Sequence, residues 1–236
     1  MVAIVAHFAG SIHDYQLGRG FAAWLVAVRP TRCSHCGREH VCILWGGYLR
    51  WVYTTTDRLR IRIERVRCTA CGVTDALLPC FLHMFRRYAL LLIQRALFLA
   101  LEQGLWGRAL IDAVGPYHRP APATIREWLW SFSLSAETWL VYWLQQTILT
   151  IDPQACLDLG QPPVHLQAIA NPRRRAAFIQ GWQALRLAEA LYAAVRAHKP
   201  DLVFQAQSLF AFLAASLGAA TRPPRVLWPA ASARPP

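Results

Sequence analysis

Hydrophobic and polar residues alternate strictly in one stretch of this chain, from Arg58 to Glu64. Leu59, Ile61 and Ile63 share one face of that segment, and Arg58, Arg60 and Arg62 share the other. A period of two residues predicts a β-strand with one buried face and one basic face. The alternation loses phase at Glu64-Arg65, shortly before a pair of cysteines.

The segment before this strand, residues 43–56, is rich in aromatic and β-branched residues and predicts a partner strand. Gly46-Gly47 lies inside it and predicts a bend or bulge, because glycine within a strand often marks one. Thr54 to Asp57 predicts the turn that joins the two strands. We therefore expect a β-hairpin here. Residues 1–32 are apolar and irregular, apart from Phe21 to Val28, which predicts a short strand or helix before the break at Arg29-Pro30.

Beyond Arg87 the apolar spacing changes to three and four residues, which predicts helices. The first runs from Tyr88 to about Gln103 and carries only two charges, so we expect it to be largely buried. Residues 138–151, about 172–198 and 202–218 predict further helices, and residues 152–171 a loop. The helix predicted at 202–218 lies within an uncharged stretch of 20 residues, 202–221. Its glutamines and serines favour a buried helix over a membrane span.

Two helical patterns in this region predict a helix-turn-helix-like pair. The first is spaced on Trp106, Ala109, Leu110 and Ala113, and the second on Ile125, Trp128, Leu129 and Phe132. Thr124 and Glu127 have the spacing of a capping box at the start of the second helix. Arg126, Glu127, Trp130 and Ser131 then face away from the core, as in a short helix that enters the major groove. The connection of nine residues, 115–123, exceeds the roughly three or four of the usual motif, so an ordinary helical hairpin stays open.

Two cysteine pairs flank the predicted hairpin, Cys33-Ser34-His35-Cys36-Gly37 and Cys68-Thr69-Ala70-Cys71-Gly72. Each pair brings two thiolates from one tight turn towards the same point, and glycine follows where the backbone turns back. Four thiolates in a tetrahedron satisfy a structural Zn²⁺ ion, so the spacing predicts a zinc ribbon held by Cys33, Cys36, Cys68 and Cys71. Two disulfides or buried thiols are the alternatives. His35 and His40 are spare, and Cys42, Cys80 and Cys156 are expected to be small buried residues.

The chain has a formal net charge of +12, from 25 basic and 13 acidic residues among 236. Lys199 is the only lysine, and arginine binds phosphates and guanine edges through its planar fork. The excess favours a polyanionic partner, with DNA ahead of a membrane surface. A GC-rich genome that encodes arginine is the plainer explanation. We expect Arg126, helped by Ser131, to contact base edges, and Arg58, Arg60, Arg62, Arg86 and Arg87 to hold phosphates.

Several of these motifs occur in one order: the first cysteine turn, Gly47-Tyr48-Leu49-Arg50, Ile61 to Gly72, Ala76-Leu77-Leu78-Pro79 and Arg86-Arg87-Tyr88. This order resembles a family of bacterial zinc-ribbon proteins of unknown function that are associated with mobile elements. It is also similar to the zinc-binding N-terminal module of insertion-sequence transposases. The resemblance covers about residues 30–133. It implies DNA binding by a ribbon and a helix-turn-helix, and it does not imply catalysis.

No catalytic residues are predicted, and we do not expect an enzyme. A nuclease of the DDE type needs three carboxylates on a mixed α/β core. After residue 133 the acids are Glu137, Asp152, Asp158, Glu189 and Asp201, and they lie on predicted helices and loops. The expected function is thus a zinc-dependent DNA-binding protein, an accessory or targeting component of a mobile element with a transposase as a possible partner. A zinc-stabilised protein scaffold and a transposase subunit with unrecognised acids are the alternatives.

The predicted fold class is α+β, a small β zinc ribbon followed by a mainly helical part. The predicted regions are a lead-in at 1–32, the ribbon at 33–82, the helix-turn-helix-like region at 83–133, a helical region at 134–220 and a disordered tail at 221–236. Reduced cysteines in metal spacing suit the cytosol, and no convincing signal peptide begins the chain. We therefore expect a cytoplasmic, nucleoid-associated protein.

Overall fold

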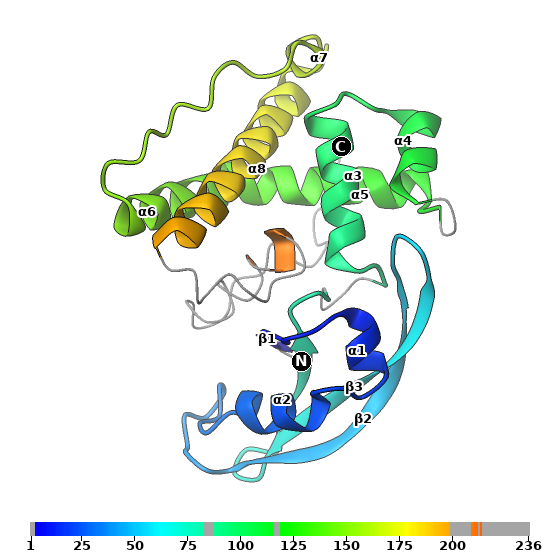
Figure 1. The fold of residues 1–236 in the computed structure, drawn as a ribbon, viewed down its shortest axis with the longest axis vertical. Helices are drawn as coiled ribbons and strands as arrows, with labels where there is room; N and C mark the ends of the chain where they lie inside the picture. Colours follow the sequence, from blue (N-terminus) through cyan, green and yellow to red (C-terminus); the bar gives the residue numbers. More distant parts are fainter. Residues whose placement is uncertain (1–2, 83–86, 116–118, 199–208, 212, 214–236) are drawn as a thin grey trace. The chain divides into compact units, whose positions relative to one another are not determined.

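The chain folds as a mixed α+β protein in the computed structural model, which describes residues 3–82, 87–115, 119–198, 209–211 and 213. These residues form two compact units (Figure 1). The first contains the described residues up to Leu91 together with 209–211 and 213, and the second contains those from Leu92 to His198. The sheet lies in the first unit and the second is helical, which confirms the α+β class.

The first unit is built on a four-stranded sheet in the order β1-β4-β3-β2. Strands β2 (Cys42–Tyr53), β3 (Arg58–Cys68) and β4 (Thr74–Pro79) pair antiparallel in turn. Strand β1 (Ala3–Ala6) runs parallel to β4, with Ala3 opposite Ala76. The prediction that the residues before Phe21 are irregular is therefore wrong, because the sheet takes up Ala3–Ala6 as an edge strand. The predicted short strand or helix at Phe21–Val28 is a helix.

The hairpin of β2 and β3 follows the predicted pattern. Leu59, Ile61 and Ile63 are buried in the core, and the arginines between them are exposed. The pairing shifts between Leu44 and Gly47, which confirms the bulge. Gly46 has a φ of 65°, a conformation that glycine adopts without strain. At Gly47 a Cβ atom would lie 2.7 Å from the carbonyl oxygen of Ile63, so only glycine fits there.

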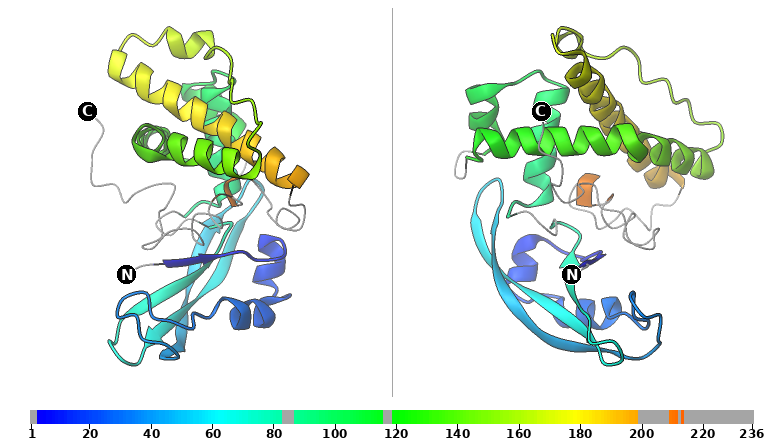
Figure 2. Two further views of the ribbon diagram at one scale, coloured as in Figure 1. Left: turned by 90° about the vertical axis from the view of Figure 1, so that its left-hand side faces the viewer. Right: turned by 180° about the vertical axis from the view of Figure 1, so that it is seen from behind.

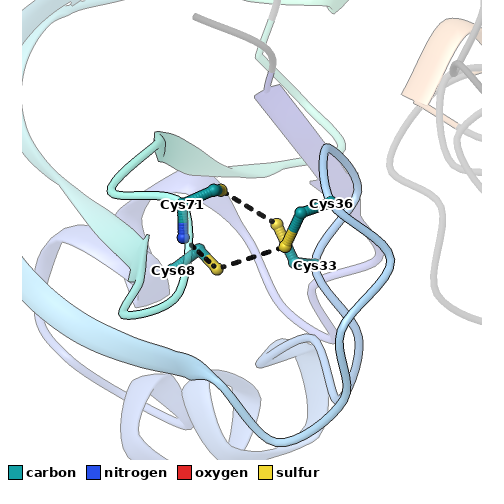
Figure 3. A group of neighbouring side chains, drawn as sticks. All are labelled: Cys33, Cys36, Cys68 and Cys71. Carbon is teal, nitrogen blue, oxygen red and sulfur yellow. Dashed lines mark hydrogen bonds between the residues drawn. The ribbon is translucent and has the colours of Figure 1, made fainter.

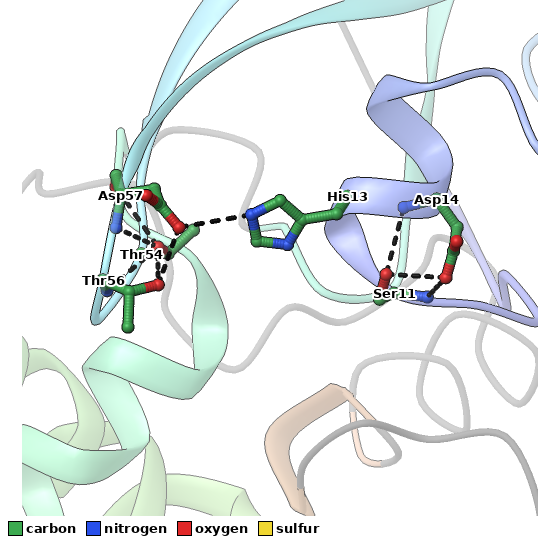
Figure 4. A network of polar contacts seen from close by, with 6 residues as sticks. All are labelled: Ser11, His13, Asp14, Thr54, Thr56 and Asp57. Atoms are coloured by element: carbon green, nitrogen blue, oxygen red, sulfur yellow. Dashed lines mark hydrogen bonds and ion pairs between the residues drawn. The ribbon is translucent and has the colours of Figure 1, made fainter.

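The predicted turn closes this hairpin between Thr54 and Asp57. The backbone N–H of Thr54 donates to the Asp57 carbonyl at 2.9 Å. The Thr54 hydroxyl also accepts from the N–H groups of Thr56 and Asp57, at 3.2 and 2.8 Å. Asp57 in turn reaches His13 of helix α1 (Ile12–Gln16), with 3.2 Å between Oδ2 and Nε2 (Figure 4). This exposed contact ties the tip of the hairpin to the N-terminal segment.

Helices α1 and α2 (Phe21–Val28) lie on the concave side of the curved hairpin (Figure 2). Helix α1 begins with a capping box, in which Ser11 accepts from the Asp14 N–H and Asp14 accepts from the Ser11 N–H. Four aromatic rings pack edge-to-face beneath the helices, with centroids 5.1–6.1 Å apart: Phe8, Tyr15, Trp24 and Phe81. This aromatic cluster and the apolar face of β3 form the core of the first unit.

The second unit begins within α3 (Leu90–Leu101), at Leu92, and α4 (Gly107–Val114) follows. Helix α3 matches the predicted apolar helix, and Leu92, Ile93 and Leu97 on it are fully buried. Helix α8 (Pro172–His198) packs against α5 (Pro122–Ser135) and α6 (Val141–Ile151). A one-turn helix, α7 (Val164–Gln167), interrupts the segment that was expected to be a loop.

Helix α5 differs from the prediction in two ways. It begins at Pro122, two residues before Thr124, and no side chain caps it, so the predicted capping box is wrong. It also does not end after Phe132. A π-helical turn at Ala136–Leu140 joins it directly to α6, and the three segments form one rod from residue 122 to residue 151 (Figure 2). The second helix of the predicted pair is thus a long one.

Part of the predicted structure lies outside the described residues. The tail at 221–236 does so entirely, as do Arg86 and part of the connection between α4 and α5. Of the predicted helix at 202–218 only residues 209–211 and 213 are described, and these are helical. Among the helices that the structure describes, none combines the length and the hydropathy that crossing a bilayer requires.

Candidate metal centre

The two cysteine pairs occupy equivalent turns at one end of the hairpin. Cys33 and Cys36 lie in the connection before β2, while Cys68 ends β3 and Cys71 lies in the turn before β4. In each turn the N–H of the following glycine donates to the carbonyl of the first cysteine, at 3.0 Å for Gly37 and 2.9 Å for Gly72. Both glycines have positive φ, 72° and 75°, as the motif predicted.

The four sulfur atoms converge on one point (Figure 3). All lie within 4.8 Å of one another, with 3.8 Å from Cys33 to Cys71 and 3.7 Å from Cys36 to Cys68. A regular tetrahedron with metal–sulfur bonds of about 2.3 Å has edges of about 3.8 Å. The donor set therefore fits a tetrahedral metal ion. All four cysteines are free thiols, so the alternative of two disulfides does not describe this structure.

Backbone hydrogen bonds favour the thiolate form of two of the four cysteines, Cys33 and Cys68. Hydrogen bonding from the Cys36 backbone lowers the pKa of Cys33. Burial opposes ionisation of Cys68, but hydrogen bonds from the backbone of Cys71 and Ala70 outweigh it and lower the pKa of its thiol. At Cys71 a hydrogen bond from the Val73 backbone is outweighed by burial and by hydrogen bonds with the neighbouring thiols, which raise its pKa to about 12. Because a metal displaces the thiol proton, a lowered pKa strengthens binding at neutral pH.

Asp75 of β4, shortly after the second cysteine turn, contacts two residues of the first turn. It is buried, with 6% of its surface exposed, and its carboxylate accepts a hydrogen bond of 3.0 Å from the Ser34 hydroxyl. The His35 ring nitrogen Nε2 lies 3.2 Å from the other carboxylate oxygen. His35 therefore belongs to the support of the first turn, and neither it nor His40 joins the group of four donors.

Cys42 lies beside the centre without belonging to it. It is buried against Cys33 and Cys68 and stands opposite Cys68 in the sheet. Burial is the main cause that raises the pKa of the Cys42 thiol, and the neighbouring Cys33 and Cys68 raise this pKa further. Cys80 is buried as predicted, whereas Cys156 is exposed, so the prediction that it is a buried residue is wrong.

The predicted phosphate-binding arginines gather near the hairpin. Arg58, Arg60 and Arg62 are exposed on one face of β3. Arg87 is also exposed, and its carbonyl accepts the Tyr53 N–H at 2.8 Å, which places it beside the closed end of the hairpin. Arg62 differs from the others because its Nε donates to the buried carboxylate of Glu64.

Aromatic rings lie among these arginines, although the arginine pattern alone does not predict them. Trp51 and Tyr53 stand opposite Arg60 and Arg58 in the register and therefore share their face. The Arg58 guanidinium lies 4.1 Å from the centre of the Trp51 ring and 5.6 Å from that of Tyr53. The signal was present in the sequence as aromatic residues at alternate positions of the partner strand.

Of the two residues predicted to contact base edges, Arg126 and Ser131, only Arg126 lies on the surface of the second unit. Arg126 is exposed on α5, but Ser131 is buried, with 8% of its surface exposed, so its predicted position away from the core is wrong. Helix α5, which packs against α8, buries a wider face than one stripe of apolar residues, and this face includes Ser131, Ser133 and Ser135. Trp130 lies one turn after Arg126, and the Arg173 guanidinium lies 5.8 Å from the centre of its ring.

Comparison of this chain with protein-family models, with curated proteins and with solved structures finds no match. The chain combines a tetrahedral set of four sulfurs with an exposed face of arginine and aromatic side chains on strands β2 and β3.

Proposed function

We propose that this chain is a zinc-dependent DNA-binding protein whose metal centre holds the hairpin as a zinc ribbon. Four thiolates at tetrahedral spacing suit Zn²⁺, and a site with four protein ligands leaves no open position for catalysis. The metal joins the connection before β2 to the end of β3, and it thereby fixes the base of the hairpin. In this proposal zinc has a structural role.

The basic face of β3 is the observation that carries DNA binding. Arg58 and Arg60 project from one exposed face of a strand within a chain of net charge +12. Guanidinium groups at alternate positions of a strand lie about 7 Å apart and suit contact with successive phosphates. Arg87 adds a further charge at the same end of the hairpin, and Arg62 contributes less because Glu64 already accepts from it.

Arg126 is our candidate for contact with base edges, as part of a helix-turn-helix-like pair of α4 and α5. It is exposed near the start of α5, and Arg173 beside Trp130 adds a neighbouring charge in the same unit. A helix that presents its N-terminal residues to the major groove uses such a position. The long rod that follows would leave the groove, so contact is confined to the first turns of α5.

A role as an accessory or targeting component of a mobile element rests on the resemblance of residues 30–133 to zinc-ribbon proteins of such elements. In this role the chain binds DNA for a partner transposase and does not cleave it. Cleavage of a plasmid by the pure protein with Mg²⁺ or Mn²⁺ would favour the transposase-subunit alternative.

The decisive experiment measures duplex DNA binding by fluorescence anisotropy between about 50 and 200 mM salt, because phosphate contacts weaken strongly over this range. We expect affinity to fall steeply with salt and to disappear after zinc is removed by a chelator. Arg60→Gln should reduce the slope of log K against log salt by about one. Affinity that does not respond to salt would contradict the proposal and favour the protein scaffold.

Base contact by Arg126 is tested on a site selected from random duplexes. Arg126→Ala should cost about 1–3 kcal/mol on the selected site and little on random DNA. Arg196, exposed near the end of α8, provides the matched control, because Arg196→Ala removes the same charge away from the start of α5. Equal losses on selected and random DNA would show that Arg126 does not contact bases.

A further inference from the structure

The exposed face of the hairpin combines two kinds of side chain that favour different parts of a nucleotide. Trp51 and Tyr53 of β2 share this face with Arg58 and Arg60 of β3. Trp51 retains 43% of its surface exposed although it is one of the largest apolar side chains. Tyr88 extends the row, because its ring lies 5.2 Å from that of Tyr53.

We propose that this face binds single-stranded DNA, with bases stacked on Trp51 and Tyr53 and phosphates held by Arg58 and Arg60. The inference rests on the proposed DNA-binding function and specifies the substrate of the hairpin. Bases in a duplex are stacked on one another and do not offer their faces to a protein ring, whereas unpaired bases do. An exposed ring on an open sheet face therefore suits a single strand.

The arginine positions agree with this assignment. The Arg58 guanidinium covers the Trp51 ring at 4.1 Å, where it occupies the surface that a base would take. A base that stacks there displaces the guanidinium, which remains close enough to pair with the adjoining phosphate. Arg60 lies 5.9 Å from the same ring and provides a second charge along the strand. The rings are thus bordered by positive charge on β3.

Charge also decides between possible occupants of this face. Protein interfaces also favour Trp, Tyr and Arg, so these residue types alone do not identify the occupant. The charge of this face does: Arg58 and Arg60 border the rings, while the acid on the same face, Glu64, is only 8% exposed and already accepts from Arg62. A polyanion with exposed aromatic bases complements this combination.

The test uses fluorescence anisotropy of the full-length zinc-loaded protein with three labelled probes. These are a single-stranded oligothymidine of about 12 nucleotides, within the usual range of site sizes, a duplex of equal length, and an abasic single strand of equal length. The abasic probe keeps the phosphates and lacks the base faces. We expect the oligothymidine to bind at least tenfold more tightly than the abasic strand or the duplex.

Trp51→Leu keeps an apolar side chain on the strand and removes the aromatic face. It should weaken oligothymidine binding by roughly 5- to 140-fold, which corresponds to ~1–3 kcal/mol per stacked base. It should leave the abasic strand unaffected, and Trp51→Phe should restore part of the loss. Tyr142→Leu is the matched control, because Tyr142 is 70% exposed on α6 of the other unit.

The outcomes separate this inference from the proposed function. Salt-dependent duplex binding that equals or exceeds single-strand binding overturns the inference and leaves DNA binding intact. An unchanged oligothymidine affinity in Trp51→Leu also overturns it, provided that zinc content and circular dichroism match the parent protein. Absence of binding to all three probes overturns both. Oligouridine binding more than tenfold tighter than oligothymidine would overturn the assignment to DNA.

Discussion

The Ser34 hydroxyl donates a 3.0 Å hydrogen bond to the buried carboxylate of Asp75. Ser34 lies between the two cysteines of the first turn, and Asp75 lies on β4 just after the second turn. The bond therefore links the two halves of the metal centre without passing through the sulfurs. Such supporting contacts orient metal ligands and affect affinity although they do not touch the metal.

Replacement of Asp75 should weaken zinc binding. We expect Asp75→Ala to raise the zinc dissociation constant by about 10- to 100-fold, because Ser34 and His35 both lose their acceptor. Asp75→Asn should have a smaller effect, since its amide oxygen still accepts from Ser34. Competition with a chromophoric chelator measures both. Asp57→Asn, on the exposed turn of the hairpin, is the control, and an affinity of Asp75→Ala equal to that control would contradict the prediction.

The metal should bind in a ratio of one zinc per chain, and its loss should unfold the hairpin. Cys36→Ser and Cys71→Ser test this with little disturbance of the core, because both residues are exposed. We expect reduced zinc by elemental analysis and a lowered melting temperature by circular dichroism, since metal binding contributes directly to folding. Cys42→Ala, next to the centre but outside the donor group, should retain the full zinc content.

Tyr15 links stability to alkaline pH. Its hydroxyl donates to the Arg62 carbonyl at 3.0 Å, so Tyr15→Phe should cost about 0.5–1.5 kcal/mol near pH 7. Burial is the main cause that raises the pKa of Tyr15 above its usual 10.0, and the charges of Glu64 and Tyr48 raise it further. Above pH 10 the unfolded chain therefore releases this proton while the folded protein retains it, and stability falls as pH rises.

Urea unfolding at pH 8, 10 and 11 should show this dependence. The parent protein should lose stability above pH 10 faster than Tyr15→Phe, so that the two curves converge. Tyr142→Phe, at a position 70% exposed, should instead run parallel to the parent protein. Parallel curves for Tyr15→Phe would contradict the assignment of the alkaline loss to Tyr15.

The close approach of α5 and α8 depends on Gly181. A Cβ atom there would lie 2.5 Å from the Ser133 hydroxyl oxygen, and Ser133 is fully buried. Gly181→Ala should destabilise the second unit by about 1–3 kcal/mol, because this overpacking exceeds the gain in helix propensity. Removal of the hydroxyl in Ser133→Ala should relieve most of that loss in the double variant.

Thermal unfolding of the two single variants and the double variant measures the coupling between these positions. Ser133→Ala alone should cost little, since its hydroxyl has no hydrogen-bond partner among the described residues. Additive losses in the double variant would show that the two side chains do not compete for the same space.

The hairpin and the cysteine centre were predictable because their signals are local or repeat a known spacing. The alternation of Leu59, Ile61 and Ile63 specifies its own buried face, and two matching cysteine turns specify four ligands. Strand β1 was not predictable in this way. It is four residues long, and its partner Ala76 is far along the chain, so no short-range pattern indicates the pairing.

The errors in α5 have a similar origin. Thr124 and Glu127 match a capping box, but proline is favoured in the first turn of a helix, and Pro122 starts α5 earlier. The spacing of apolar residues placed Ser131 outside the core. That spacing shows only the apolar stripe, whereas the buried face of α5 in the folded chain also includes serines.

The parallel pairing of β1 with β4 has a consequence for the order in which the first unit folds. The β2–β3 hairpin joins neighbouring segments, so it closes a short loop, whereas Ala3 finds Ala76 only by closing almost the whole unit. Long-range pairing of this kind slows folding, because chain entropy is lost before contacts compensate for it. We expect the N-terminal strand to be the last to dock, so that a newly made chain presents β4 as an open sheet edge until its own first residues return to cover it.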